Sequence, residues 1–337
     1  MPLRQIEVVI PEYDKQAFEK LLENESVEHF WQDTSESSGF VLKVLVDAAQ
    51  TENFLDQAEQ VFSGRDDYRL IMTTVEATLP RYEEQEEETE KAEEKSEEPW
   101  EKPLKGVRVS REELYSDISD GIKLSSIYIL LVILSTIVAA LGILRDNTAV
   151  VIGAMVIAPL LGPNVGLALA TTLADMELGK KSLLSNITGL SVAFLLSVIL
   201  GFILNVDISL YHISSRVEVQ LSDIALALAS GAAGVLAYTV GMSAAVIGVM
   251  VAVALLPPLV VTGLLAGDFQ WIPAVHSALL LLTNIICVNL AAVTTFILQG
   301  VKPRTWYESN KATKMNKIAI SIWLSLLIIL STIIYIV

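Results

Sequence analysis

The side chains of this sequence that could bind a ligand are almost all uncharged and lie inside apolar segments. Amide and hydroxyl groups of this kind can hydrogen-bond a solute or coordinate an ion. No Asp, Glu, Lys or Arg occurs between Ser182 and Val206 or between Ile224 and Gly267. A carboxylate proton relay and a buried cation that holds an anion are therefore not expected there. The neutral candidates in the apolar segments of the chain are Asn164, Thr171, Thr172, Asn186, Thr188, Thr262, Asn284, Asn289 and Thr294.

Prolines interrupt two of these segments near their centres. Pro159 and Pro163 flank the middle of residues 149–173, and Pro257 and Pro258 follow the middle of residues 244–266. Because proline removes a backbone donor and clashes with the preceding turn, both segments are predicted to break there. A break at mid-membrane exposes carbonyls and a new helix N-terminus, which together can hold an ion or a polar solute. The predicted site comprises Pro159, Gly162, Pro163, Asn164, Leu255, Pro257, Pro258, Asn186, Asn284 and Thr262.

Residues typical of an enzyme or a metal site are scarce. The one cysteine, Cys287, lies in an apolar run, so neither an intramolecular disulfide nor a cysteine-rich metal site can form. His29 stands alone in the first part of the chain, and His276 opens an apolar segment. Without a histidine pair, a catalytic dyad or a reactive cysteine, we expect no enzymatic activity, no metal and no cofactor.

Charge divides the 337 residues into two parts. Residues 1–121 carry 31 Asp/Glu and 13 Lys/Arg, whereas residues 122–337 carry 8 and 10. The first part is acidic and suits water, and the second is too apolar to be a soluble core. No basic surface is available to neutralise phosphates, so a nucleic-acid partner is not expected. Residues 1–30 lack the apolar stretch of a signal peptide, which predicts that the N-terminus stays where it is synthesised.

The elements of the first part alternate in a recognisable order. Residues 1–80 contain patterns of strand, helix, strand, strand, helix and strand, which predict a ferredoxin-like α+β domain. Residues 81–108 follow as an acidic linker, with eleven glutamates between Glu83 and Glu101, and should not fold. Residues 109–122 open with a capping box at Ser110 and are predicted to form an amphipathic helix at the membrane interface.

The second part is predicted to cross the membrane seven times, because each apolar segment has about 20 residues. Short loops on the side of the N-terminus, with the stretch before the first span, hold twelve Lys and Arg, against Arg145 and Arg216 on the other side. The excess predicts a cytoplasmic head and an external C-terminus, in the cytoplasmic membrane. Residues 301–317 form a basic cytoplasmic loop before the last span. The predicted spans are 124–144, 149–173, 182–205, 222–241, 244–266, 273–298 and 318–337.

An internal repeat relates the first six spans. The segment Val151–Pro163 matches Val246–Pro258 at an offset of 95 residues, including the motif V-I-G-x-M-V. The same offset relates the first span to the fourth and the third to the sixth. Because three spans make an odd unit, the second copy must enter the membrane inverted, as in many secondary transporters. The sequence therefore predicts a 3+3 inverted repeat with two broken helices.

The chain also resembles a known prokaryotic family. The segments that carry the resemblance are Ser110–Tyr115, Leu134–Gly142, Val151–Pro159 and Leu255–Leu259. They resemble the membrane proteins grouped as domain of unknown function 389, the uncharacterised hydrophobic domain proteins. The resemblance covers most of residues 1–300 and implies a bacterial or archaeal cell-membrane protein, but it implies no activity.

Two functions remain open at this point. The repeat and the predicted breaks favour a transporter or channel for a small solute or ion, with a regulatory or oligomerising head. The alternative is a membrane-anchored sensor or scaffold whose spans only assemble the heads. A wet cavity at the breaks distinguishes the first from the second. The small residues of the fourth span further predict a homo-oligomer in the bilayer.

Overall fold

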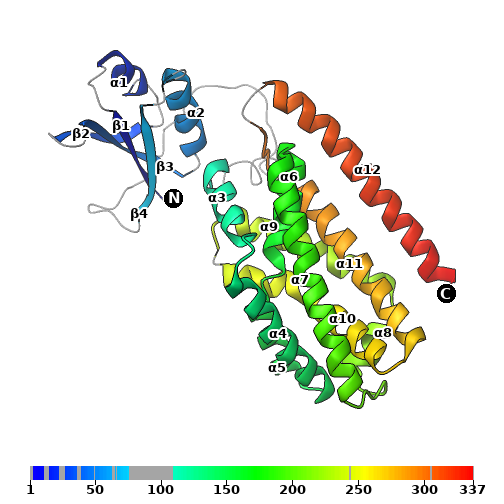
Figure 1. The fold of residues 1–337 in the computed structure, drawn as a ribbon. Helices are drawn as coiled ribbons and strands as arrows, with labels where there is room; N and C mark the ends of the chain where they lie inside the picture. The colour runs from blue at the N-terminus through cyan, green and yellow to red at the C-terminus, as the bar shows by residue number, and fades with distance from the viewer. Residues whose placement is uncertain are drawn as a thin grey trace, which may run out of the picture. The chain divides into compact units, whose positions relative to one another are not determined.

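The computed structural model forms two compact units, Met1–Glu113 and Leu114–Val337. Each unit is described by itself (Figure 1). The predicted linker 81–108 lies outside the described residues. The structure describes residues 3–10, 15–22, 27–35, 39–48, 50–62, 65, 67–75, 109–242, 244–303 and 306–336.

The first unit is the predicted α+β domain. Its four strands form one antiparallel sheet in the order β2-β3-β1-β4, so the first strand lies in the middle between the third and the fourth. This arrangement is the split βαβ topology that the sequence pattern indicated. In chain order the elements are β1 (Leu3–Ile10), α1 (Lys15–Leu22), β2 (Val27–Ser35), β3 (Gly39–Asp47), α2 (Thr51–Val61) and β4 (Arg69–Val75).

Alternation along the strands builds the core of this unit. Ile6, Val8 and Ile10 alternate in β1 with residues of intermediate exposure, so one face of the sheet is apolar. That face is covered by the apolar sides of the two helices, whose Phe18 and Phe54 are fully buried. The core therefore lies between the sheet and the two helices.

The second unit is a bundle of helices connected by short loops. Its long helices lie side by side in Figure 1, and α12 contacts α11 and α6 at the edge of the bundle. The helices are α4 (Ser126–Leu144), α5 (Thr148–Ile157), α6 (Leu161–Leu173), α7 (Met176–Ile203), α8 (Tyr211–Val217), α9 (Leu221–Thr239), α10 (Ala244–Gly267), α11 (Trp271–Leu298) and α12 (Trp306–Ile336).

Several of these helices are suited to a bilayer. Five helices in the described part of the chain are long and apolar enough to span a membrane: α4, α7, α9, α11 and α12. The pair α5 and α6 adds a sixth if the two helices form one span. Large apolar side chains on the bundle surface, such as Phe202 and Ile272, are more than two-thirds exposed, which suits contact with lipid rather than water.

The predicted amphipathic helix is α3 (Arg111–Gly121). The Ser110 side chain accepts a hydrogen bond from the Glu113 N–H at 3.2 Å, which is one of the two bonds of the predicted capping box, whereas the Glu113 carboxylate accepts from Arg4. Ile118 and Ile122 are buried, and both lie beside Gly166 of α6. The apolar side of the segment that follows the cap is therefore covered, at least in part, by α6.

The break in the first proline-containing segment is confirmed. Helix α5 ends at Ile157, α6 begins at Leu161, and their axes differ by 51°. Pro159 lies in the break and cannot donate to the carbonyl of Met155 four residues earlier. Pro163 lies in the first turn of α6, where its missing N–H would have no helical partner. Asn164 also lies in this first part of α6, three residues after the helix begins at Leu161.

The prediction of a second broken helix is wrong. Helix α10 continues from Ala244 to Gly267 with Pro257 and Pro258 inside it. A proline inside a helix leaves the carbonyl four residues earlier without its donor, and membrane helices tolerate this when neighbouring groups satisfy that carbonyl. In α10 the Ala254 carbonyl is satisfied in this way, by a side chain of α11.

Small residues bring several helices into close contact. A methyl group on Gly201 of α7 would collide with the carbonyl of Leu264 of α10, and one on Gly267 would collide with the carbonyl of Val198. Gly231 of α9 similarly faces Val288 of α11 at backbone distance. The small residues of α9, from which the sequence predicted an oligomer, therefore already have a partner within the same chain.

Candidate functional site

Three buried asparagines from three different helices meet next to the α5–α6 break. Asn164 of α6 accepts two hydrogen bonds at Oδ1, from Nδ2 of Asn186 at 2.9 Å and from Nδ2 of Asn289 at 3.1 Å. Its own Nδ2 donates to the carbonyl of Leu160, the residue that precedes α6, at 2.9 Å. Asn164 and Asn289 are each 1% exposed and Asn186 is 7% exposed. We call Asn164, Asn186 and Asn289 the asparagine cluster.

The orientation of each amide in the asparagine cluster follows from this network. Asn164 must direct its NH2 group at the Leu160 carbonyl, because a carbonyl can only accept. Its Oδ1 therefore faces the other two side chains, which must both present NH2 groups to it. Asn289 donates in addition to the carbonyl of Ile285 at 2.9 Å. The NH2 group of Asn289 therefore makes both of these bonds, and the Oδ1 atom of the same amide has no hydrogen-bond partner.

A fourth asparagine explains why α10 stays continuous. Nδ2 of Asn284 on α11 donates to the carbonyl of Ala254 at 2.7 Å. Ala254 lies four residues before Pro258, so this carbonyl lacks a helical donor because proline has no N–H. The side chain from α11 thus replaces the missing backbone N–H. The Oδ1 atom of Asn284, like that of Asn289, is buried without a partner.

The carbonyl of Pro258 is also covered by side chains. Thr262 donates to it at 2.7 Å from one turn later in α10, and Ser277 donates to it at 3.1 Å from α11. Thr262 is 7% exposed and Ser277 is fully buried. Polar side chains of α11 therefore bond two carbonyls of α10, that of Ala254 before the proline pair and that of Pro258 itself.

The structure brings together only part of the predicted site. Asn164 and Asn186 are in contact, as the prediction requires, whereas Asn284 and Thr262 belong to the separate contact at Pro258. Gly162 faces the carbonyl of Gly121, where an added methyl group would lie 2.6 Å from the oxygen, so it serves close packing. Leu255 is fully buried in the core of the bundle.

Asn289 is the member of the asparagine cluster that the predicted site omits. It belongs to the set of neutral polar residues that the sequence indicates, but Asn284 matches Asn186 more closely in its place within the repeat. Contact between α6 and α11, which are separated by about a hundred residues, decides between the two. The sequence offers no signal for that choice.

A second polar cluster joins the short helix α8 to the start of α5. His212 of α8 is buried, with Nε2 at 3.1 Å from Oγ1 of Thr148 and Nδ1 at 3.3 Å from Arg216. Its backbone N–H donates to the Asp146 carboxylate at 3.0 Å. Burial, followed by the positive charge of Arg216, lowers the pKa of His212, and Asp146 opposes this shift. His212 is therefore neutral at pH 7, and it fixes the loop at the start of α5.

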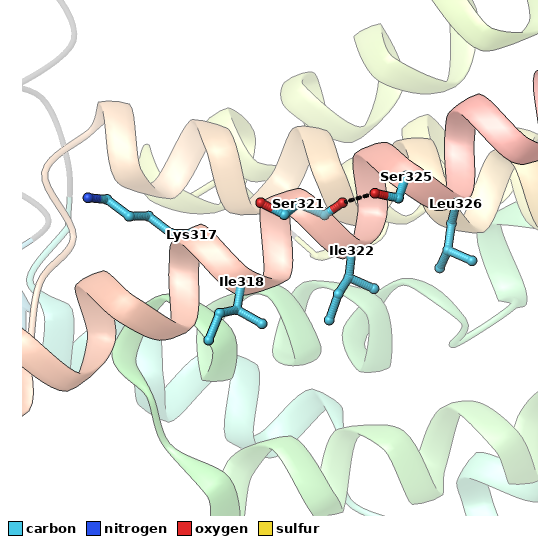
Figure 2. A pocket seen from close by; sticks show the side chains of 6 residues that line it. All are labelled: Lys317, Ile318, Ser321, Ile322, Ser325 and Leu326. Carbon is cyan, nitrogen blue, oxygen red and sulfur yellow. Dashed lines mark hydrogen bonds between the residues drawn. The ribbon is translucent and has the colours of Figure 1, made fainter.

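Two surface hollows are lined by described residues, and neither is enclosed. Figure 2 shows one along α12, where the Ser325 hydroxyl donates to the carbonyl of Ser321 of its own helix. Because a single helix supplies all of its lining residues, it is an exposed helix face. Those residues are Lys317, Ile318, Ser321, Ile322, Ser325 and Leu326. His276 lines another hollow, together with Glu218. Among the described residues no three His, Cys, Asp or Glu side chains gather in a way that could hold a metal.

Comparisons with known proteins agree with the resemblance seen in the sequence. Residues 155–290 match the family described as domain of unknown function, DUF389. This range contains the asparagine cluster and Asn284. The chain is also similar to a protein of Methanocaldococcus jannaschii named "Uncharacterized protein MJ0678", with 35% identity over 329 residues and 97% of each chain covered. No solved structure matches the chain.

Proposed function

The chain belongs to the DUF389 family, and from the geometry of the asparagine cluster we propose that it is a membrane transporter or channel for a small solute or ion. The observation that carries this proposal is a group of uncharged amides beside a broken helix, at the contact between three apolar helices. Buried polar groups in lipid-spanning proteins are costly, and beside a broken helix they are candidates for a pathway or a binding site. The head then has a regulatory or oligomerising role.

Matching helix bounds in the two halves of the second unit support the proposed inverted repeat. Both ends of α9 (Leu221–Thr239) lie 95 residues after the ends of α4 (Ser126–Leu144). Both ends of α11 (Trp271–Leu298) likewise lie 95 residues after those of α7 (Met176–Ile203). Helix α7 packs on α10 while α6 packs on α11, so equivalent helices of the two halves make equivalent contacts. The proposed seven spans are α4, the pair α5 and α6, α7, α9, α10, α11 and α12. The proposed orientation places the head in the cytoplasm of a prokaryote.

The continuity of α10 favours the alternative, a membrane-anchored sensor or scaffold with packed kinks. Asn284 and Ser277 satisfy the carbonyls around Pro258 as a purely structural polar contact would. The two functions differ in whether water reaches the asparagine cluster. A transporter must hydrate it in at least one state, and a scaffold must keep it dry.

Thiol labelling distinguishes the two functions. Cys287 is the sole cysteine and is fully buried, so the chain offers a low background. In a Cys287→Ala background, Asn186→Cys should react with a charged, membrane-impermeant methanethiosulfonate reagent. Ile199→Cys, on the same helix but 55% exposed on the bundle surface, is the matched control and should stay unreactive in lipid. Equal protection of both thiols would contradict a transport pathway.

Flux in proteoliposomes gives the functional test. We expect the purified protein to accelerate the passage of a small neutral solute or a salt, measured by light scattering after an osmotic step. Asn164→Ala should reduce this rate while expression stays normal. Ser325→Ala, which removes an exposed hydroxyl bonded only within α12, should not change it. A rate equal to that of empty vesicles for neutral solutes and for salts would overturn the proposal.

A further inference from the structure

The asparagine cluster beside the α5–α6 break leaves one buried acceptor without a partner. Oδ1 of Asn289 is buried without a partner, while both Nδ2 bonds of that side chain are made. Pro159 lacks an N–H, so the carbonyl of Met155 four residues earlier also has no helical donor. A buried acceptor without a donor is unfavourable by about 1–3 kcal/mol, so a water or ligand that supplies a donor or a positive charge is favoured there.

The charge of the surroundings limits what that ligand can be. Helices α5, α6, α10 and α11 contain no Asp, Glu, Lys or Arg, and α7 contains charged residues only before Ser182. Calcium and magnesium sites draw on carboxylates, and the desolvation of a doubly charged ion could not be offset by neutral amides. A singly charged ion needs less compensation, and amide and carbonyl oxygens are the ligands of choice for a hard cation.

We propose that the asparagine cluster binds a monovalent alkali cation, with Oδ1 of Asn289 as a ligand and Asn164 and Asn186 as positioning residues. This inference rests on the proposed function and names the class of ion that the site takes. Asn164 holds the other two amides by accepting from both, so the free oxygen of Asn289 has a fixed direction. The cation is either the transported species or one that is coupled to it.

Thermal unfolding of the purified full-length chain tests the proposal. The midpoint should rise saturably with NaCl or KCl relative to N-methyl-D-glucamine chloride at equal ionic strength. Binding at ten times the dissociation constant corresponds to a rise of about 2 °C. Exchange of chloride for gluconate at constant sodium should leave the midpoint unchanged, whereas an effect of the anion alone would assign the site to an anion and overturn the proposal.

Variants of one residue separate binding from a merely structural role. Asn289→Leu should abolish the cation-dependent rise. Asn289→Asp loses the two bonds that the NH2 group donates to Asn164 and Ile285, but it keeps an oxygen ligand and adds a negative charge. The response to cations should therefore strengthen and extend to calcium. Thr294→Val on the same helix removes a hydroxyl that is bonded only to the carbonyl of Leu290, and should behave as wild type. An identical rise in wild type and Asn289→Leu would refute the site.

Failure of this inference can be told apart from failure of the proposed function. Flux of a neutral solute together with an unfolding midpoint that does not depend on sodium or potassium would overturn the cation site and leave a transporter. If Asn289→Leu cannot be purified, the response of Asn289→Asp to calcium decides instead. A response of that variant no different from wild type would count against the site.

Discussion

The contact between Asn284 and Ala254 makes a quantitative prediction about how α10 tolerates its prolines. Asn284 is 6% exposed and its Nδ2 lies 2.7 Å from the Ala254 carbonyl. Because Pro258 has no N–H, Asn284→Ala should leave this carbonyl without a donor in the core of the bundle. The expected cost is about 1–2 kcal/mol in the free energy of unfolding, within the range measured for buried and interhelical hydrogen bonds.

A double-mutant cycle separates the cost of the lost hydrogen bond from the cost of the cavity that Asn284→Ala creates. Pro258→Ala restores an N–H at the position in α10 from which Ala254 would normally receive its bond. In that background, Asn284→Ala should cost about half as much, which gives a coupling energy of at least about 0.5 kcal/mol. The assay is reversible unfolding in mixed micelles with increasing sodium dodecyl sulfate.

The matched control for this cycle is the neighbouring residue on α11. Thr283 is also fully buried, but its hydroxyl donates at 2.8 Å to Leu279 of its own helix. Thr283→Ala should therefore show no coupling to Pro258→Ala. Additive effects of Asn284→Ala and Pro258→Ala would refute the role of Asn284 in keeping α10 continuous.

Three further predictions concern packing, pH and topology. Gly201→Ala should destabilise the bundle by about 1–3 kcal/mol, because its methyl group meets the Leu264 carbonyl. Gly153→Ala is the control and should be neutral or stabilising, because no atom of another element lies within 4 Å of the added methyl group. Unfolding in mixed micelles compares the two variants. The lowered pKa of His212 means that the unfolded chain binds more protons, so the unfolding midpoint should fall as the pH drops below about 6.5, and His212→Gln should reduce this dependence. A reporter fused after Val337 should read as external, and a cytoplasmic reading would reverse the proposed orientation.

Much of the architecture follows from local patterns in the sequence. The alternation of Ile6, Val8 and Ile10 fixes which face of β1 is buried, and the order of strands and helices fixes the topology of the first unit. The break at Pro159 was also predicted from the local sequence, because proline removes the N–H that the Met155 carbonyl would need. The 95-residue offset was visible as matched motifs, and the helix ends reproduce it.

The tertiary structure decided what the prolines and asparagines do. Pro257 and Pro258 have the same local chemistry as Pro159, yet α10 does not break, because Asn284 reaches the Ala254 carbonyl from thirty residues away. The asparagine cluster likewise depends on the packing of α6 against α11, which brings Asn289 rather than Asn284 to Asn164. A sequence shows which groups lack a partner within their own helix, but whether another helix supplies that partner depends on contacts that local patterns do not encode.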